Sequence, residues 1–206
     1  MGSGIACHFA NIGVEVLLLD IVPRALNDKE KAKGLTLESS IVRNRLVNEA
    51  LMTSLKSKPS PIYSQKFADR ITTGNIEDDL HKIKEVDWVM EVVVERLDIK
   101  QQVFEKIEKY RTPGTLITSN TSGIPIKFMN EGRSEDFQKN FAVTHFFNPP
   151  RYLKLFEVVP GPKCTQEVTD FLMMYGDKFL GKTAVLAKDT PAFIGNRIGI
   201  FGIMSL

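Results

Sequence analysis

The sequence predicts an α/β protein built around a mostly parallel β-sheet. Short runs rich in aliphatic and β-branched residues alternate with amphipathic helical patterns along most of the 206 residues. This alternation is typical of parallel strands joined by crossover helices. One connection, centred on Arg151, is too short for a crossover and predicts a single antiparallel strand pair. The composition, 43% hydrophobic and 25% charged, is that of an ordinary globular chain.

Local patterns define the elements of the amino-terminal part. A helix of small and apolar residues stops at Gly13, and the apolar run after it reads as a buried strand. Between residues 24 and 58, apolar side chains recur every four residues, which indicates helix, and Pro59 ends it. Within residues 1–75 we expect a helix at 1–12, a strand at 14–19, helical segments within 24–58 and a strand at 71–73. Within residues 76–130 we expect a short helix at 76–84, a strand at 88–94, a helix capped by Asp98 and ending at Tyr110, a strand at 115–118, and a short helix with Pro125 in its first turn.

The carboxyl-terminal part begins with two β-rich runs separated by Asn148-Pro149-Pro150-Arg151-Tyr152. The elements expected here are strands at 141–147 and 153–159, a helix at 165–180, a strand at 183–187, and a last, largely apolar helix opened by Pro191. With the turn centred on Arg151, His145 and Glu157 stand six residues to either side of it. We therefore expect them to face each other across the strand pair, within hydrogen-bonding reach.

Composition and motif spacing argue against several classes of function. The net charge of +2 is too balanced for binding nucleic acid through its phosphates. The three histidines lie far apart without metal-ligand spacing, so no metal site is predicted. The apolar runs are too short to span a membrane. Two cysteines without a CxxC pair, and no secretory signal pattern at the start, favour a reducing, cytoplasmic setting.

Two features indicate an anionic ligand. Residues 24–58 hold eight Lys or Arg against four acids, which is either a solvated face or a surface for phosphates. Asp20 ends an apolar strand 18 residues after Gly2, close to the spacing at which dinucleotide folds place the acid that binds a ribose hydroxyl. The strand and the first two glycines of a GxGxxG motif do not precede Gly2, so this signal is weak by itself.

Six parts of the sequence are informative when they are taken together: Gly2 to Ala6, Asp20, Glu91 to Glu95, Ser119 to Ser122, His145-Phe146-Phe147-Asn148-Pro149, and Lys188 to Phe193. Together they resemble the NAD-binding domain of the L-3-hydroxyacyl-CoA dehydrogenase family, the enzymes of fatty-acid β-oxidation. The resemblance runs from Gly2 to about Gly199, and the His-Phe-Phe-Asn-Pro segment followed by a glutamate is its most specific part. The segment after Pro149 also resembles long bacterial members that carry an enoyl-CoA hydratase.

The resemblance implies a Rossmann-like, doubly wound, mostly parallel sheet that lacks its first strand. It implies an NAD-binding domain at residues 1–188, truncated at its start, and the first helix of an α-helical domain at 189–206. The resemblance also implies a homodimer, because in the family this second domain usually forms the dimer. The apolar last helix is expected either to dimerise or to pack back onto the chain.

The resemblance also implies the roles of four catalytic residues. His145 takes the position of the general base in oxidation, or acid in reduction, and Glu157 that of the carboxylate that fixes its tautomer. Ser122 matches a serine near substrate and nicotinamide, and Asn196 an asparagine that polarises the reacting oxygen. The implied reaction is the NAD-dependent oxidation of L-3-hydroxyacyl-CoA to 3-ketoacyl-CoA.

NAD is the implied cofactor and acyl-CoA the implied partner. Asp20 would bind the adenosine ribose and favour NAD over NADP, because a carboxylate repels a 2′-phosphate. The other positions that match cofactor contacts are Gly2, Glu95, Lys100 and Asn148. No single CoA-binding lysine can be assigned within residues 24–58.

Simpler readings remain open for these residues. Glu95 and Lys100 are equally well explained as solvated surface charges, Ser122 as a helix cap, and Asn196 as a polar position in a terminal helix. The chain as a whole is alternatively a non-catalytic module that retains weak nucleotide or CoA binding or that associates with other proteins. A dehydrogenase for a different hydroxy acid fits the His-Phe-Phe-Asn-Pro segment poorly.

Overall fold

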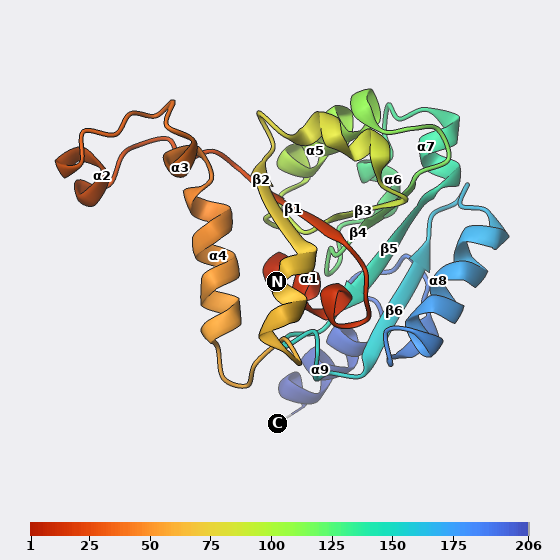
Figure 1. Cartoon of the computed structure of the whole chain (residues 1–206). Coiled ribbons are helices and arrows are strands. Elements are labelled where there is room, and N and C mark those ends of the chain that lie inside the picture. Colours follow the sequence, from red (N-terminus) through yellow and green to blue (C-terminus); the bar gives the residue numbers. More distant parts are fainter. Residues whose placement is uncertain (206) are drawn as a thin grey trace. The chain divides into compact units, whose positions relative to one another are not determined.

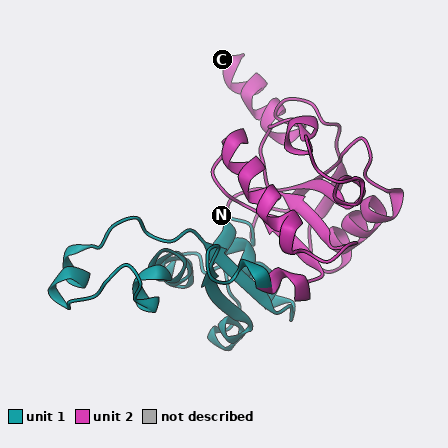
Figure 2. Ribbon diagram, turned by 90° about the horizontal axis from the view of Figure 1, so that it is seen from above, with its two compact units in different colours: residues 1–81, 149–151 teal, residues 82–148, 152–206 magenta. Residues whose placement is uncertain are grey.

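The computed structural model describes residues 1–205, and the chain divides into two compact units. Unit 1 comprises Met1–His81 with Pro149–Arg151, and unit 2 comprises Lys82–Asn148 with Tyr152–Leu206 (Figure 2). Helices alternate with strands in both, and all strand pairs except one are parallel, which confirms the predicted fold class (Figure 1). Within the described residues, no helix is both long and apolar enough to cross a membrane.

Unit 1 holds a two-stranded parallel sheet that pairs Val16 with Ile71 and Asp20 with Asn75. Small residues of the first helix, Ala6, Cys7 and Ala10, form a buried core with Ile62 and Ile71, so the helix lies close to the sheet. The elements of this unit are α1 (Gly2–Asn11), β1 (Val16–Asp20), α2 (Asp28–Ala32), α3 (Ser40–Arg43), α4 (Arg45–Lys56), η1 (Gln65–Arg70) and β2 (Ile71–Asn75). A 3-10 helix, η2 (Leu80–Glu85), follows where a short helix was expected.

Unit 2 holds a five-stranded sheet in the order β3-β4-β5-β6-β7. Only β5 and β6 are antiparallel, as the short connection between them predicts. The elements are β3 (Trp88–Glu91), α5 (Leu97–Tyr110), β4 (Leu116–Ser119), α6 (Ile126–Met129), α7 (Glu135–Lys139), β5 (Phe141–Phe146), β6 (Leu155–Pro160), α8 (Gln166–Lys178), β7 (Thr183–Leu186) and α9 (Gly195–Met204).

Aromatic side chains cover both faces of this sheet. Phe141 of β5 packs against Phe104 of α5 and Phe137 of α7, with ring centroids 5.3 Å and 5.5 Å away. Phe156 of β6 lies against Gly176 of α8, on the opposite face, where an added Cβ would come within 2.7 Å of the ring. Helices therefore cover the sheet on both sides, as a doubly wound fold requires.

Three local predictions were wrong. Asp98 does not cap α5: Arg96 is the N-cap residue, and Asp98 pairs with its guanidinium from within the first turn. Strand β3 ends at Glu91 rather than Val94, because the Glu91 carboxylate accepts a hydrogen bond from the Val93 amide and turns the chain. The last helix begins at Gly195 rather than Pro191, after a turn described below.

Candidate active site

His145 and Glu157 form a buried pair on neighbouring strands. The register of β5 and β6 places them directly opposite each other, which confirms the cross-strand prediction. His145 Nδ1 lies 2.6 Å from Glu157 Oε2, and both side chains are almost completely buried. A buried carboxylate at this distance holds the imidazole in one orientation.

The second oxygen of Glu157 binds the amino terminus of α9. Oε1 accepts hydrogen bonds from the backbone amides of Ile194, at 2.9 Å, and Gly195, at 2.7 Å. Ile194 is the N-cap residue and has no side-chain acceptor, so Glu157 replaces the missing cap from another element. A negative charge at this end is also favoured by the helix dipole. One carboxylate thus joins the histidine to the start of α9.

The turn before α9 has an unusual backbone. Ala192 and Phe193 adopt φ values of 62° and 46°, in the left-handed region that non-glycine residues rarely occupy. Phe193 is buried, with its ring centroid 5.8 Å from that of His145. At Gly195 an added Cβ would lie 2.7 Å from the ring of Phe147, which itself contacts His145. Strain at this turn is maintained by contacts at the His145 site, a common feature of functional sites.

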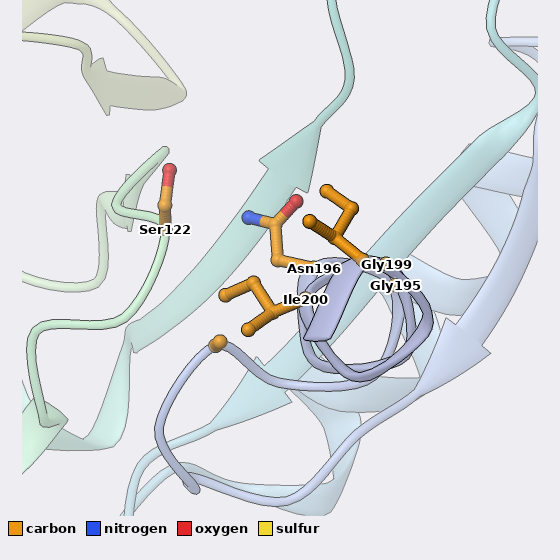
Figure 3. A pocket seen from close by; sticks show the side chains of 7 residues that line it. Ser122, Gly195, Asn196, Gly199 and Ile200 are labelled. Carbon is orange, nitrogen blue, oxygen red and sulfur yellow. The ribbon is translucent and has the colours of Figure 1, made fainter. Parts of the chain in front are cut away.

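A pocket of about 460 Å³ opens beside this turn, within unit 2. Ser122 and Asn196 contribute the polar side chains, Ser122 from the loop after β4 and Asn196 from the first turn of α9 (Figure 3). The other residues that line it are Ala192, Gly195, Gly199, Ile200 and Ile203. The two residues that the resemblance places near the substrate and the reacting oxygen therefore line one cavity, whose remaining wall is apolar or backbone.

Ser122 does not cap the short helix after it. Pro125 is the N-cap residue of α6, and no side chain caps that helix. The amide of Ser122 instead donates to Glu95 Oε1 at 2.9 Å, and the hydroxyl of Thr121 donates to the same oxygen. Burial raises the pKa of Glu95, but these two hydrogen bonds and the charge of Lys100 outweigh it, so the pKa lies below its usual range.

Lys100 is buried, so the interpretation of this residue as a solvated surface charge was wrong. Its side chain is 1% exposed, and the ammonium lies 2.9 Å and 3.0 Å from the two oxygens of Glu91 and 3.3 Å from Glu95 Oε2. Glu91, at the end of β3, is a residue to which the sequence assigned no role. The signal that could have identified it is a carboxylate within an otherwise apolar run, nine residues before a lysine on the next helix.

Unit 1 contains the features expected of the adenosine side of a dinucleotide site. Helix α1 starts at Gly2 after Met1, which makes no side-chain cap, so the amides of its first turn have no partner within the helix. Such amides, together with the helix dipole, suit a phosphate group. Asp20 closes β1 half-buried, with Oδ1 accepting from its neighbouring amide Ile21. A carboxylate at the carboxyl end of a strand suits a ribose diol.

The remaining predicted positions are less tightly defined. Asn148 is exposed, at the end of the first of the two segments that make up unit 2. In the basic region of unit 1, Arg43 is bound to Glu38, Glu77 and Asp78, and Arg45 to Glu30, so these two side chains are engaged within the unit. Among residues 1–205, no group of three or more His, Cys, Asp or Glu is placed to hold a metal ion.

Residues 1–190 match the family described as 3-hydroxyacyl-CoA dehydrogenase, NAD binding domain. The chain is 52% identical over 204 residues to a probable 3-hydroxyacyl-CoA dehydrogenase of Bacillus subtilis (strain 168), a match that covers 99% of this chain. It is 39% identical over 201 residues, 98% of this chain, to a putative fatty acid oxidation complex trifunctional enzyme of Rickettsia felis.

The fold is also similar to that of solved structures. The crystal structure of M. tuberculosis FadB2 matches with a TM-score of 0.74 and 27% identity, over 100% of this chain and 66% of that chain. The chain spans only 26% of the Bacillus relative and 26% of the Rickettsia relative. What these longer proteins do as a whole therefore does not transfer directly to this chain.

Proposed function

The chain belongs to the family of the 3-hydroxyacyl-CoA dehydrogenase NAD-binding domain, and from this membership we propose that it carries out the acid–base and cofactor-binding part of that reaction. The substrate is the CoA thioester of an L-3-hydroxy acid, and the product is the 3-ketoacyl-CoA of fatty-acid β-oxidation. The observation that carries the proposal is the buried contact of 2.6 Å between His145 Nδ1 and Glu157 Oε2.

His145 acts as the general base. With Nδ1 directed at the Glu157 carboxylate, Nδ1 carries the proton and Nε2 has a free lone pair. Nε2 accepts the hydroxyl proton of the substrate while the C–H bond breaks and the C–O bond becomes a carbonyl. When bound, NAD supplies the acceptor for the hydride. Glu157 stabilises the imidazolium that results, and in the reverse direction the same proton returns to the oxygen.

Ser122 and Asn196 position the reacting oxygen in the pocket that both side chains face. A hydroxyl and an amide N–H each donate a hydrogen bond, and donors arranged before the reaction stabilise developing negative charge at little reorganisation cost. Ile200 and Ile203 provide an apolar wall for the acyl chain.

Residues of each unit fit part of NAD. In unit 1, the first turn of α1 from Gly2 onward binds phosphate through its amides, and Asp20 binds the adenosine ribose. In unit 2, Glu95 and Asn148 are proposed cofactor contacts. The ammonium of Lys100 is buried against the carboxylates of Glu91 and Glu95. Lys100 therefore affects cofactor binding indirectly, by holding Glu95.

NADH oxidation with acetoacetyl-CoA tests the proposal. We would measure it for this chain and for a chimera in which the chain replaces the matched 204 residues of the Bacillus relative. The chimera should be active, and His145→Gln should lower its kcat by about 10²–10⁴-fold. Lys139→Met, an exposed change on α7, serves as the matched control and should leave kcat unchanged.

An inactive chimera beside an active parent would contradict the proposal, and so would full activity in the His145→Gln variant. A chimera that binds NADH without turnover would support the non-catalytic module instead. Gel filtration of the same proteins tests the predicted homodimer, and fractionation of the source cells tests the cytoplasmic location. Both of these features remain predictions.

A further inference from the structure

The loop that carries Ser122 is held by two carboxylates. Glu91 Oε2 accepts a hydrogen bond from the Ser119 hydroxyl at 2.5 Å, at the beginning of the loop. Glu95 Oε1 accepts from the hydroxyl of Thr121 and from the amide of Ser122, at its end. Glu95 binds Ser122 through the backbone amide and not through the side chain. The Ser122 hydroxyl is therefore not used in this network, and the residue lines the pocket.

Lys100 connects these two carboxylates. Its ammonium donates hydrogen bonds to both oxygens of Glu91 and forms an ion pair with one oxygen of Glu95. The side chains of Lys100 and Glu91 are 1% and 0% exposed, so this interaction is shielded from water. A buried ammonium requires compensating charge, and here Glu91 provides it from the end of β3.

Glu95 differs from its two partners because its side chain is 45% exposed. A glutamate with so much solvent access normally samples several rotamers, which costs free energy when it is fixed. The ion pair between Lys100 and Glu95 Oε2 restricts the rotamers of Glu95, while Glu95 Oε1 accepts hydrogen bonds from Thr121 and Ser122. The order of Glu95 therefore depends on a lysine that is itself fixed by Glu91.

We propose that Glu91 and Lys100 are positioning residues: together they hold Glu95, and through it the Thr121–Ser122 backbone, so that the Ser122 hydroxyl is placed for the reacting oxygen. This inference rests on the proposed function of Ser122, while the arrangement of the loop itself does not. Neither Glu91 nor Lys100 contacts the substrate in this role. Both act on the reaction only through the loop.

The test combines charge rescue with amide exchange. Glu91→Gln and Lys100→Met each leave a buried charge without its partner and should lower the unfolding midpoint. The double variant Glu91→Gln/Lys100→Met restores the charge balance, so its midpoint should return toward that of the parent. In the double variant the amides of residues 121–123 should still exchange at least about 10-fold faster, because Glu95 is no longer held.

Activity provides the second measurement. In the active chimera, the double variant should show a kcat at least about 10-fold lower, because the Ser122 hydroxyl is no longer held in position. NADH should also bind more weakly, because Glu95 is itself a proposed cofactor contact. Glu108→Gln is the matched control: it removes the ion pair with Arg133 from the same helix, α5, and should change neither loop exchange nor kcat.

Two results would overturn the inference. One is a double variant in which the unfolding midpoint, the exchange rate of the loop amides and kcat all return to the parent values. That result is expected if the ion pair between Glu91 and Lys100 only stabilises the fold. The other is loop exchange as slow as in the parent in Glu95→Ala, which removes the acceptor for Thr121 and Ser122. Because the Glu95 side chain is 45% exposed, this variant can be measured if the double variant does not fold. The two proposals can fail separately. If the chimera without substitutions is inactive, the proposed function is contradicted. If loop exchange is still faster in the double variant of that chimera, the role of Glu91 and Lys100 in holding the loop is supported.

Discussion

Glu157 binds His145 with one carboxylate oxygen and the amides of Ile194 and Gly195 with the other. Glu157 therefore contacts both the histidine and the beginning of α9. It orients the imidazole on β5, and it fixes the start of α9, whose first turn presents Asn196 to the pocket. A substitution at Glu157 should consequently affect the acid–base group and the oxygen-binding group at once.

Glu157→Gln should lower kcat by about 10²–10⁴-fold, by comparison with the loss seen when the carboxylate of a catalytic triad becomes an amide. A glutamine amide that donates to Nδ1 forces the proton onto Nε2, where the base must be unprotonated. Stopped-flow measurement of NADH formation in the chimera provides the rate. Glu167→Gln, an exposed glutamate in the first turn of α8, is the control and should retain the parent rate.

Asp20 should determine the choice of cofactor. Asp20→Asn removes the charge that binds the ribose diol and repels a 2′-phosphate, so NADH should bind about 10–100-fold more weakly while NADPH loses little. Fluorescence titration with both nucleotides gives the ratio of affinities. Glu15→Gln, an exposed acid just before β1, should leave the ratio unchanged. An unaltered NADH to NADPH preference in Asp20→Asn would argue against this role.

The part of the site that the sequence predicts well is the part governed by short-range geometry. The hairpin of β5 and β6 allows few registers, because a short connection joins two strands and one buried face must be maintained. Residue spacing around Arg151 was therefore enough to place His145 opposite Glu157. The same reasoning succeeds for the parallel sheet, where each crossover contains its own helical pattern.

What the sequence does not predict depends on contacts between distant segments. Proline commonly opens a helix, so Pro191 was a reasonable but wrong start for α9. The left-handed backbone at Ala192 and Phe193 arises because Glu157 and the aromatic rings around His145 hold the chain there. The burial of Lys100 is a similar case, since a lysine in the first turns of a helix is normally solvated.

Lys182 should make stability depend on pH. Burial, with a smaller effect of the Lys154 charge, lowers the pKa of Lys182 to about 8. In the unfolded chain it titrates near 10.4, so between these values the unfolded state binds more protons and the free energy of unfolding rises with pH. The penalty is fully present below pH 8 and disappears above pH 10.5.

Lys182→Met removes this titration. The difference in unfolding free energy between variant and parent should therefore be more favourable to the variant at pH 7 than at pH 10, although the loss of the hydrogen bond to the Leu153 carbonyl adds a pH-independent cost. Urea unfolding at both pH values measures it. Lys154→Met should give a smaller change in the same direction. A difference that does not vary with pH would refute the assignment.

Two glycines of α9 provide the sharpest test of how closely this helix approaches the site. At Gly195 an added Cβ would lie 2.7 Å from Phe147 Cζ and 2.9 Å from Leu155 Cδ2, whereas at Gly199, one turn later, no atom lies within 4 Å. Gly195→Ala should therefore destabilise the chain by about 1–3 kcal/mol through overpacking. Gly199→Ala should stabilise α9 by about 0.5–1 kcal/mol, because alanine loses less backbone entropy in a helix.

Urea unfolding followed by far-UV circular dichroism compares the two variants under the same conditions. Because Phe147 also contacts the His145 ring, with centroids 4.4 Å apart, the displacement forced by Gly195→Ala should lower kcat as well, and Gly199→Ala should leave His145 undisturbed. Equal effects of the two substitutions on stability would mean that α9 does not pack against Phe147 and Leu155. In that case the amides of Ile194 and Gly195 would have no fixed position from which to donate to Glu157, and the link between the histidine and α9 would fail with it.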